Sequence, residues 1–212
     1  MALTTPDEMA KIVRKLRKAD PAFIPVIKNS PLCTIASKKY NRGHYETLIN
    51  SIISQQLAIK AADTIINRVR VLADGALVPE NIVDLSATDL RTAGVSGAKA
   101  RAIAELTEAT ISGTLNFKKF PKMTNEEISE ALTSIWGIGR WTVEMFLIFH
   151  LGRLDIWPVG DLAVRRGWEK LHKLPEQISQ KDLDLLGANF AGYQSVVAWY
   201  CWRATDGDSS TW

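Results

Sequence analysis

The sequence predicts an all-α fold. Apolar residues recur at spacings of three and four along most of the chain, whereas the strict alternation of a half-buried strand is nearly absent. Residues that cap helix N-termini stand before several of these runs, and glycines follow them. With 212 residues, the chain is long enough to bury a substantial core as one domain or as two small lobes.

Each predicted helix has its own signals. Thr5 and Glu8 form a capping box with Pro6 at the first helical position, and Ser86 with Asp89 caps a short helix that Gly94 should end. Between them, two apolar stripes predict helices; these stripes are Tyr45, Leu48, Ile49, Ile52 and Ile53, and then Ile59, Ala62, Ile65, Ile66 and Val69. Further helices are predicted over residues 96–111, from 124, from 140 to 151, after 161, and over 194–203.

The region from Thr124 to Gly152 predicts two helices joined by a tight hairpin. Thr124 and Glu127 form another capping box, and Gly137 and Gly139 allow the chain to reverse before a second helix begins at Arg140. Backbone N–H groups at such a turn can bind an anion, and Arg140 adds positive charge there. The alternative is an ordinary helical hairpin whose glycines only turn the chain.

Composition limits the function classes. The net charge is +3, from 26 basic and 23 acidic residues, which permits nucleic-acid binding without requiring it. Cys33 and Cys201 form no CxxC motif, so we expect free thiols, a reducing compartment and no four-cysteine iron–sulfur cluster. We expect no metal held by side chains. No apolar run has the roughly 20 residues of a membrane span and no signal peptide is visible, which predicts an intracellular protein without membrane contact.

Three segments resemble the helix-hairpin-helix (HhH-GPD) DNA glycosylase superfamily, and within it the alkylpurine, or 3-methyladenine DNA glycosylase II, branch. The first segment runs from GIGRWT at residues 137–142 through Trp157-Pro158 to Asp161, and the others are residues 51–62 and 188–203. The resemblance implies one catalytic unit, residues 1–212, built from two helical lobes. The middle lobe would cover residues 44–151 and the second lobe 1–43 plus 152–212, with an active-site cleft between them.

The resemblance makes Asp161 the catalytic residue. It stands twenty residues after Trp141 (161 − 141 = 20) and before an apolar helical run, so locally it also reads as a helix N-cap. An ionised carboxylate there could stabilise the positive charge on the sugar as the base leaves, or activate water, and both roles stay open. Where superfamily members that cut the DNA backbone have a lysine nucleophile, this chain has Trp141. That substitution predicts a monofunctional glycosylase without AP-lyase activity.

The resemblance also implies a base pocket. Trp141 and Trp199 match aromatic positions of the family pocket, where a flipped purine carrying positive charge after methylation would stack on electron-rich rings. The expected bases are 3-methyladenine and 7-methylguanine. Met145 occupies a position where some relatives have tyrosine, so the pocket is less aromatic here.

DNA contacts are implied at three places. The segment Gln55, Gln56, Leu57 and Ala58 matches the family loop that enters the minor groove, with Gln56 as the residue expected to fill the gap left by the flipped base. The hairpin residues Gly137, Ile138, Gly139 and Arg140 would hold a phosphate, with a monovalent cation as a possible bridge and no other cofactor. Gly97 and Lys99, at the start of a predicted helix, would bind a second phosphate, unless Lys99 belongs to a solvated face.

The expected function is therefore hydrolysis of the N-glycosidic bond of alkylated purines in double-stranded DNA, which leaves an abasic site for base excision repair. An alternative is a damage-binding or abasic-site-binding protein on the same fold with little or no catalysis, because Ala58, Met145 and Gly160 depart from the family pattern. A generic helix-hairpin-helix DNA-binding module is a third reading, although it needs neither Asp161 nor Trp199. We expect a monomer, located in the nucleus of a eukaryote or the cytoplasm and nucleoid of a prokaryote.

Overall fold

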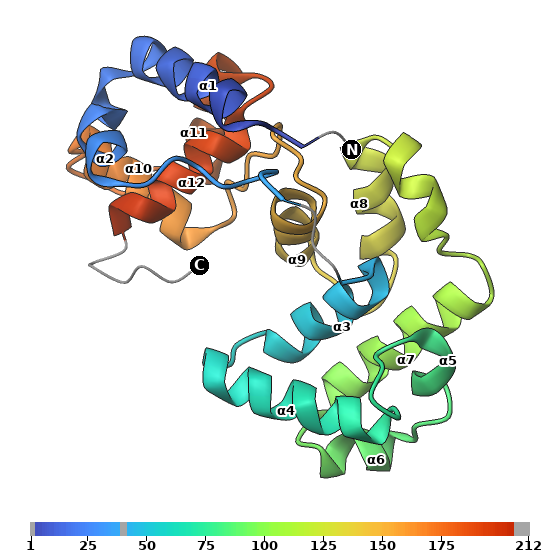
Figure 1. Cartoon of the computed structure of the whole chain (residues 1–212). Helices are drawn as coiled ribbons and strands as arrows, with labels where there is room; N and C mark the ends of the chain where they lie inside the picture. Colours follow the sequence, from blue (N-terminus) through green and yellow to red (C-terminus); the bar gives the residue numbers. More distant parts are fainter. Residues whose placement is uncertain (1–2, 39–41, 206–212) are drawn as a thin grey trace. The chain divides into compact units, whose positions relative to one another are not determined.

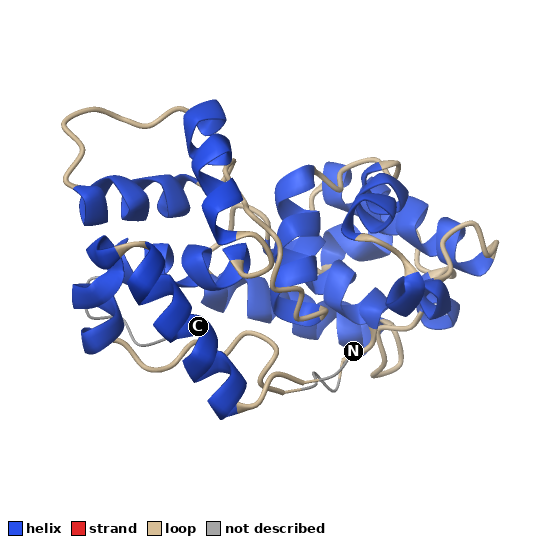
Figure 2. Ribbon diagram, turned by 90° about the horizontal axis from the view of Figure 1, so that it is seen from above, coloured by secondary structure: helices blue, strands red, loops and turns tan. Residues whose placement is uncertain are grey.

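The structure, a computed structural model, describes residues 3–38 and 42–205. Regular secondary structure in these residues is helical throughout, and Figure 2 shows only helices and connecting loops. The all-α prediction is therefore confirmed. Within the same residues, the helices are all too short or too polar to cross a membrane.

The chain divides after Lys39 and after Phe146 into two compact units. The middle of the chain forms one of them, here called the middle unit. The two ends of the chain together form the other, here called the end unit (Figure 1).

Helix α3 contributes much of the core of the middle unit. It packs against α4 and α7, and Leu48, Ile49, Ile52 and Ile53 on it are fully buried. Each such side chain contributes about 1.5–3 kcal/mol when it leaves water. The helices of this unit are α3 (His44–Ser54), α4 (Ile59–Leu72), α5 (Pro79–Ile82), α6 (Ala87–Thr92), α7 (Gly97–Ile111), α8 (Asn125–Thr133) and α9 (Arg140–Met145), with a 3-10 segment at Phe117–Lys122.

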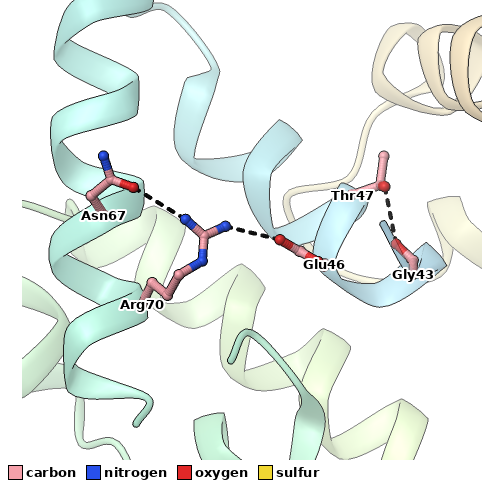
Figure 3. A network of polar contacts seen from close by, with 5 residues as sticks. All are labelled: Gly43, Glu46, Thr47, Asn67 and Arg70. Atoms are coloured by element: carbon pink, nitrogen blue, oxygen red, sulfur yellow. Dashed lines mark hydrogen bonds and ion pairs between the residues drawn. The ribbon is translucent and has the colours of Figure 1, made fainter. Parts of the chain in front are cut away.

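A half-buried ion pair joins α3 to α4 (Figure 3). One Arg70 nitrogen, Nη2, donates to Glu46 Oε1 at 2.9 Å, and Nη1 donates to Asn67 Oδ1 at 3.1 Å. Nearby, Thr47 Oγ1 donates to the Gly43 carbonyl at 3.0 Å and closes the first turn of α3. The Arg70–Glu46 pair thus ties the first turn of α3 to the last turn of α4.

Replacing Glu46 with alanine should lower the free energy of unfolding by about 0.5–1 kcal/mol, because a partly solvated ion pair is screened by water. Urea unfolding measures the change. An Arg70→Ala variant and the double variant complete a thermodynamic cycle, in which the coupling energy should account for most of the Glu46 effect. Fully additive single effects would show that the ion pair contributes nothing.

In the end unit, α10 packs chiefly against α12. Phe23, Trp168 and Phe190 meet edge to face around this pair, and His172 stacks on Trp168 with ring centroids 4.0 Å apart. The helices here are α1 (Pro6–Ala19), α2 (Ile24–Asn29), α10 (Leu162–His172), α11 (Gln180–Gly187) and α12 (Gln194–Thr205), with 3-10 turns at Pro21–Phe23 and Ala188–Phe190.

Most local predictions are confirmed. The capping boxes predicted at Thr5 and Thr124 form, and the predicted cap at Ser86 is a capping box as well. Both cysteines are free and buried. Two predictions need correction. Ile59, placed in the apolar stripe of α4, is 69% exposed because it begins the helix at the end of a surface loop. The helix predicted from Arg140 to residue 151 is α-helical only to Met145 and continues as a π turn over Phe146–His150.

Candidate active site and nucleic-acid interface

The hairpin between α8 and α9 forms as predicted. Gly137 adopts φ +84°, a left-handed conformation that favours glycine, and Gly139 is the N-cap of α9. Between them Ile138 is buried, and its N–H donates to the Ile135 carbonyl at 3.1 Å. The buried isoleucine anchors the turn, so the two glycines are presented on a rigid base.

The outer side of this hairpin has room for a ligand. Gly139 supplies no side-chain oxygen to the first-turn N–H groups of α9, and a Cβ placed on it would meet nothing within 4 Å. The Arg140 side chain is 79% exposed and pairs with Glu144 at 2.9 Å (Nε to Oε1). The charge that the sequence assigns to phosphate binding is thus partly offset by a carboxylate of the same helix.

A Gly137→Ala substitution should destabilise the middle unit by about 2 kcal/mol, because it adds left-handed strain of about 1 kcal/mol to a steric overlap. The new Cβ would lie 2.7 Å from the Ala102 Cβ. Thermal unfolding measures the loss. Ala102→Gly removes the overlap but itself costs about 1 kcal/mol in the interior of α7. In the Ala102→Gly background, Gly137→Ala should therefore cost only the backbone strain of about 1 kcal/mol.

The loop between α3 and α4 lies beside the hairpin. Gln55 Nε2 donates to the Gly137 carbonyl at 3.2 Å and to Thr142 Oγ1 at 3.3 Å. Gln56 is exposed and takes φ +58°, and Leu57 is 38% exposed. Gln55 therefore ties this loop to the hairpin, while the next residues project from the surface. Sequence reasoning missed this tie, because 82 residues separate Gln55 from Gly137.

A cavity of about 430 Å³ lies between this loop and α9. The half-exposed ring of Trp141 (49% exposed) and the Met145 side chain form part of its wall. Two groups predicted separately from the sequence thus line one pocket. They are the loop residues Gln55, Gln56 and Leu57 and the base-pocket residues Trp141 and Met145. Its full lining is Arg42, Thr47, Asn50, Ser51, Ser54, Gln55, Gln56, Leu57, Trp141, Thr142 and Met145.

Lys99 has contacts that the sequence did not predict. Its Nζ donates to the carbonyls of Ile53 at 2.8 Å and Gln55 at 2.7 Å, and partial burial lowers the pKa of its ammonium. Gly97 is the first residue of α7, whose N-cap Ser96 accepts a hydrogen bond from the Lys99 N–H. The ammonium therefore faces backbone carbonyls of its own unit instead of belonging to a fully solvated face, and its contact with DNA stays a prediction.

Asp161 is the N-cap of α10, as predicted. The side chain is buried, and its Oδ1 accepts hydrogen bonds from the Val164 N–H at 2.9 Å and from the Trp202 indole N–H at 3.1 Å. Two N–H donors and the positive end of a helix complement a negative carboxylate. The Trp202 partner was not predicted, because it lies 41 residues further along the chain.

Trp199 belongs to the end unit with Asp161, whereas Trp141 and Met145 belong to the middle unit. Trp199 is 6% exposed. Its ring lies edge to face with the Tyr200 ring, with centroids 4.8 Å apart, and the Arg203 guanidinium lies 5.2 Å from the Trp199 ring centroid. Within its own unit Trp199 is thus mainly a packed aromatic, and its contact with a base stays a prediction.

Comparison with known proteins defines the class. The family model for HhH-GPD superfamily base excision DNA repair proteins matches residues 49–188, and the chain belongs to this family. It is 40% identical over 164 residues to DNA-3-methyladenine glycosylase 1 of Schizosaccharomyces pombe, a match that covers 76% of this chain and 72% of that protein.

Solved structures agree with this assignment. The DNA-3-methyladenine glycosidase of Bacillus halodurans superposes with a TM-score of 0.82 at 35% identity, covering 96% of this chain and 91% of that one. A 3-methyladenine DNA glycosylase of Schizosaccharomyces pombe, solved in complex with abasic DNA, superposes with a TM-score of 0.75 at 34% identity, covering 92% and 95%. The family resemblance and the fold predicted from the sequence are therefore confirmed.

Proposed function

We propose that this protein is a 3-methyladenine DNA glycosylase that acts in base excision repair and leaves an abasic site. The observation that carries the proposal is Asp161, a buried carboxylate held at the N-terminus of α10 by two N–H donors. The sequence resemblance assigns the family's essential aspartate to this residue. Relatives at 35–40% identity bear the names of enzymes of this activity.

In the proposed reaction, the bond between C1′ of the deoxyribose and the base nitrogen breaks, and the electron pair leaves with the base. Methylation at N3 or N7 of a purine already gives the base a positive charge, so it departs as a neutral molecule and positive charge develops on the sugar. Asp161 stabilises that charge electrostatically. A water oxygen then bonds to C1′ and loses its proton, either to Asp161 or to solvent.

Trp141, Met145 and Trp199 are the proposed base contacts. The half-exposed Trp141 ring can stack on a flipped cationic purine, an attraction worth about 0.5–2 kcal/mol. Because Trp141 stands where a lysine nucleophile would form a Schiff base, the proposed enzyme has no AP-lyase activity.

Double-stranded DNA that carries alkylated bases or abasic sites is the proposed partner. In this proposal Gln56, with Leu57 and Ala58 beside it, enters the minor groove. The exposure of these three residues, on the loop that Gln55 holds, supports this role. Gly137, Ile138, Gly139 and Arg140 would contact one phosphate, and the start of α7 at Gly97 another. A monovalent cation at the hairpin would need backbone carbonyl oxygens as ligands. One of these carbonyls, that of Gly137, already accepts a hydrogen bond from the Gln55 side chain.

The alternative, a damage-binding protein with little catalysis, is favoured by one observation. Ala58 is the N-cap of α4 and supplies no side-chain hydrogen bond there. The family resemblance implies a polar residue at this position. The loop that would probe the lesion is therefore less polar than the family pattern implies.

Single-turnover release of 3-methyladenine and 7-methylguanine from methylated duplex DNA distinguishes the two functions. We expect release of free base, with the product strand intact until alkali cleaves it at the abasic site. Strand cleavage without alkali would contradict the monofunctional mechanism. No base release, together with tight binding to abasic-site DNA, would contradict the proposed enzymatic function and support the damage-binding alternative.

A further inference from the structure

We propose that Lys99 is a positioning residue, which holds the probing loop (Gln55–Ala58) in register with the hairpin instead of binding DNA phosphate. The inference rests on the proposed function, because it assigns Lys99 a part in base excision. Its evidence lies wholly within the middle unit, in contacts made by α7.

Lys99 holds the C-terminal end of α3. The last carbonyls of a helix have no partner within it, and cations stabilise this negative end. The Lys99 ammonium donates to the carbonyls of Ile53 and Gln55 at 2.8 and 2.7 Å, so it caps α3 where the probing loop begins. Partial burial lowers the pKa of Lys99, which agrees with an ammonium drawn away from solvent.

The face of α7 that carries Lys99 also contacts the hairpin. Ala102 lies one turn further along. It packs so close to the hairpin that a Cβ added to Gly137 would overlap the Ala102 Cβ. Glu105, a further turn along, accepts the Trp136 N–H at 3.1 Å and is held by Arg101 Nε at 2.9 Å. A single helix face therefore contacts the start of the probing loop with one residue and the hairpin with two others.

Gln55 links Lys99 to the hairpin. Its carbonyl accepts from Lys99, and its side-chain amide donates to the Gly137 carbonyl, so it is held from both sides. The next residue, Gln56, takes φ +58°, a conformation that a non-glycine residue keeps only where its surroundings impose it. The contacts of Lys99 and Gln55 supply that constraint and aim the residues after them.

Two consequences separate positioning from phosphate binding. A phosphate contact releases counterions from DNA. Its loss should therefore reduce the slope of log K against log salt concentration by about 0.9 in magnitude. A positioning contact leaves that slope unchanged. Its loss should instead slow base release at saturating DNA, because the loop enters the duplex in the wrong register.

The test uses the full chain with Lys99→Met, which keeps the side-chain length and removes the donors. Lys99→Arg can again donate to both carbonyls, and Lys11→Met removes the same charge from an exposed site on α1 in the end unit. We expect Lys99→Met to slow single-turnover release at saturating DNA at least tenfold, with an unchanged salt slope for abasic-site DNA. Lys99→Arg should restore most of the rate, and Lys11→Met should match wild type.

Hydrogen exchange of the free protein gives a readout that needs no activity. The Leu57 N–H donates to the Ser54 carbonyl at 3.1 Å, and its exchange should accelerate at least about threefold in Lys99→Met. A fall in salt slope with unchanged release at saturation and unchanged Leu57 exchange would overturn the proposal in favour of a phosphate contact. If wild type released no base, the proposed function would fail, and exchange and salt slope would still decide the role of Lys99.

Discussion

Replacing Asp161 with asparagine is expected to slow base release by about 100- to 1,000-fold while the protein stays folded. Asparagine keeps an oxygen that can accept from the Val164 N–H and the Trp202 indole, the two donors that hold the native Oδ1. Asparagine and aspartate are also near-equal helix N-caps. The variant therefore removes the negative charge with little change in structure, and single-turnover kinetics on methylated DNA measures its effect.

The Asp161→Ala variant is the matched control for stability. It should lower the free energy of unfolding by about 2–4 kcal/mol, because it removes the cap and leaves the buried Trp202 N–H without this acceptor. Asp161→Asn should unfold within about 1 kcal/mol of wild type. Full activity in a folded Asp161→Asn protein would refute the catalytic assignment, whereas equal instability of both variants would show that charge, not only hydrogen bonding, holds this site together.

Gly167→Ala should have the largest effect on stability, a loss of about 3 kcal/mol or more. A Cβ at this buried position of α10 would lie 2.0 Å from the Cys201 carbonyl oxygen and 2.8 Å from its Cα, both backbone atoms of α12. Backbone in a packed helix cannot turn aside as a side-chain end can, so α10 and α12 would have to separate. Because Asp161 caps α10 and bonds to Trp202 on α12, base release should fall as well.

Gly97→Ala is the matched control for that steric argument. It is also a helical glycine, at the first position of α7, but a Cβ there would meet nothing within 4 Å. Its unfolding free energy should stay level or rise by up to about 1 kcal/mol, since alanine is the better helix former. Urea unfolding compares the two variants. An equally small effect of Gly167→Ala would mean that α10 and α12 adjust to the added methyl group.

Local signals predicted the helices because each depends on residues close together in the chain. A capping box needs only positions N-cap and N3, and a glycine in a left-handed turn acts through its own backbone. Thr124 with Glu127, Gly137 and Asp161 could therefore be assigned from spacing alone, and the structure places each in the predicted local conformation. The short helix α11 escaped prediction, because no apolar stripe of comparable length identifies it.

The sequence by itself thus determined the helical class, the hairpin, the cap at Asp161 and, through the resemblance of its motifs, the family. Only the tertiary structure decided which distant residues hold these parts. Trp202 on Asp161, Gln55 on the hairpin and Lys99 on the end of α3 are pairs separated by 41, 82 and at least 44 residues. Such contacts depend on how helices pack, and packing depends on burial summed over the whole core rather than on any local pattern.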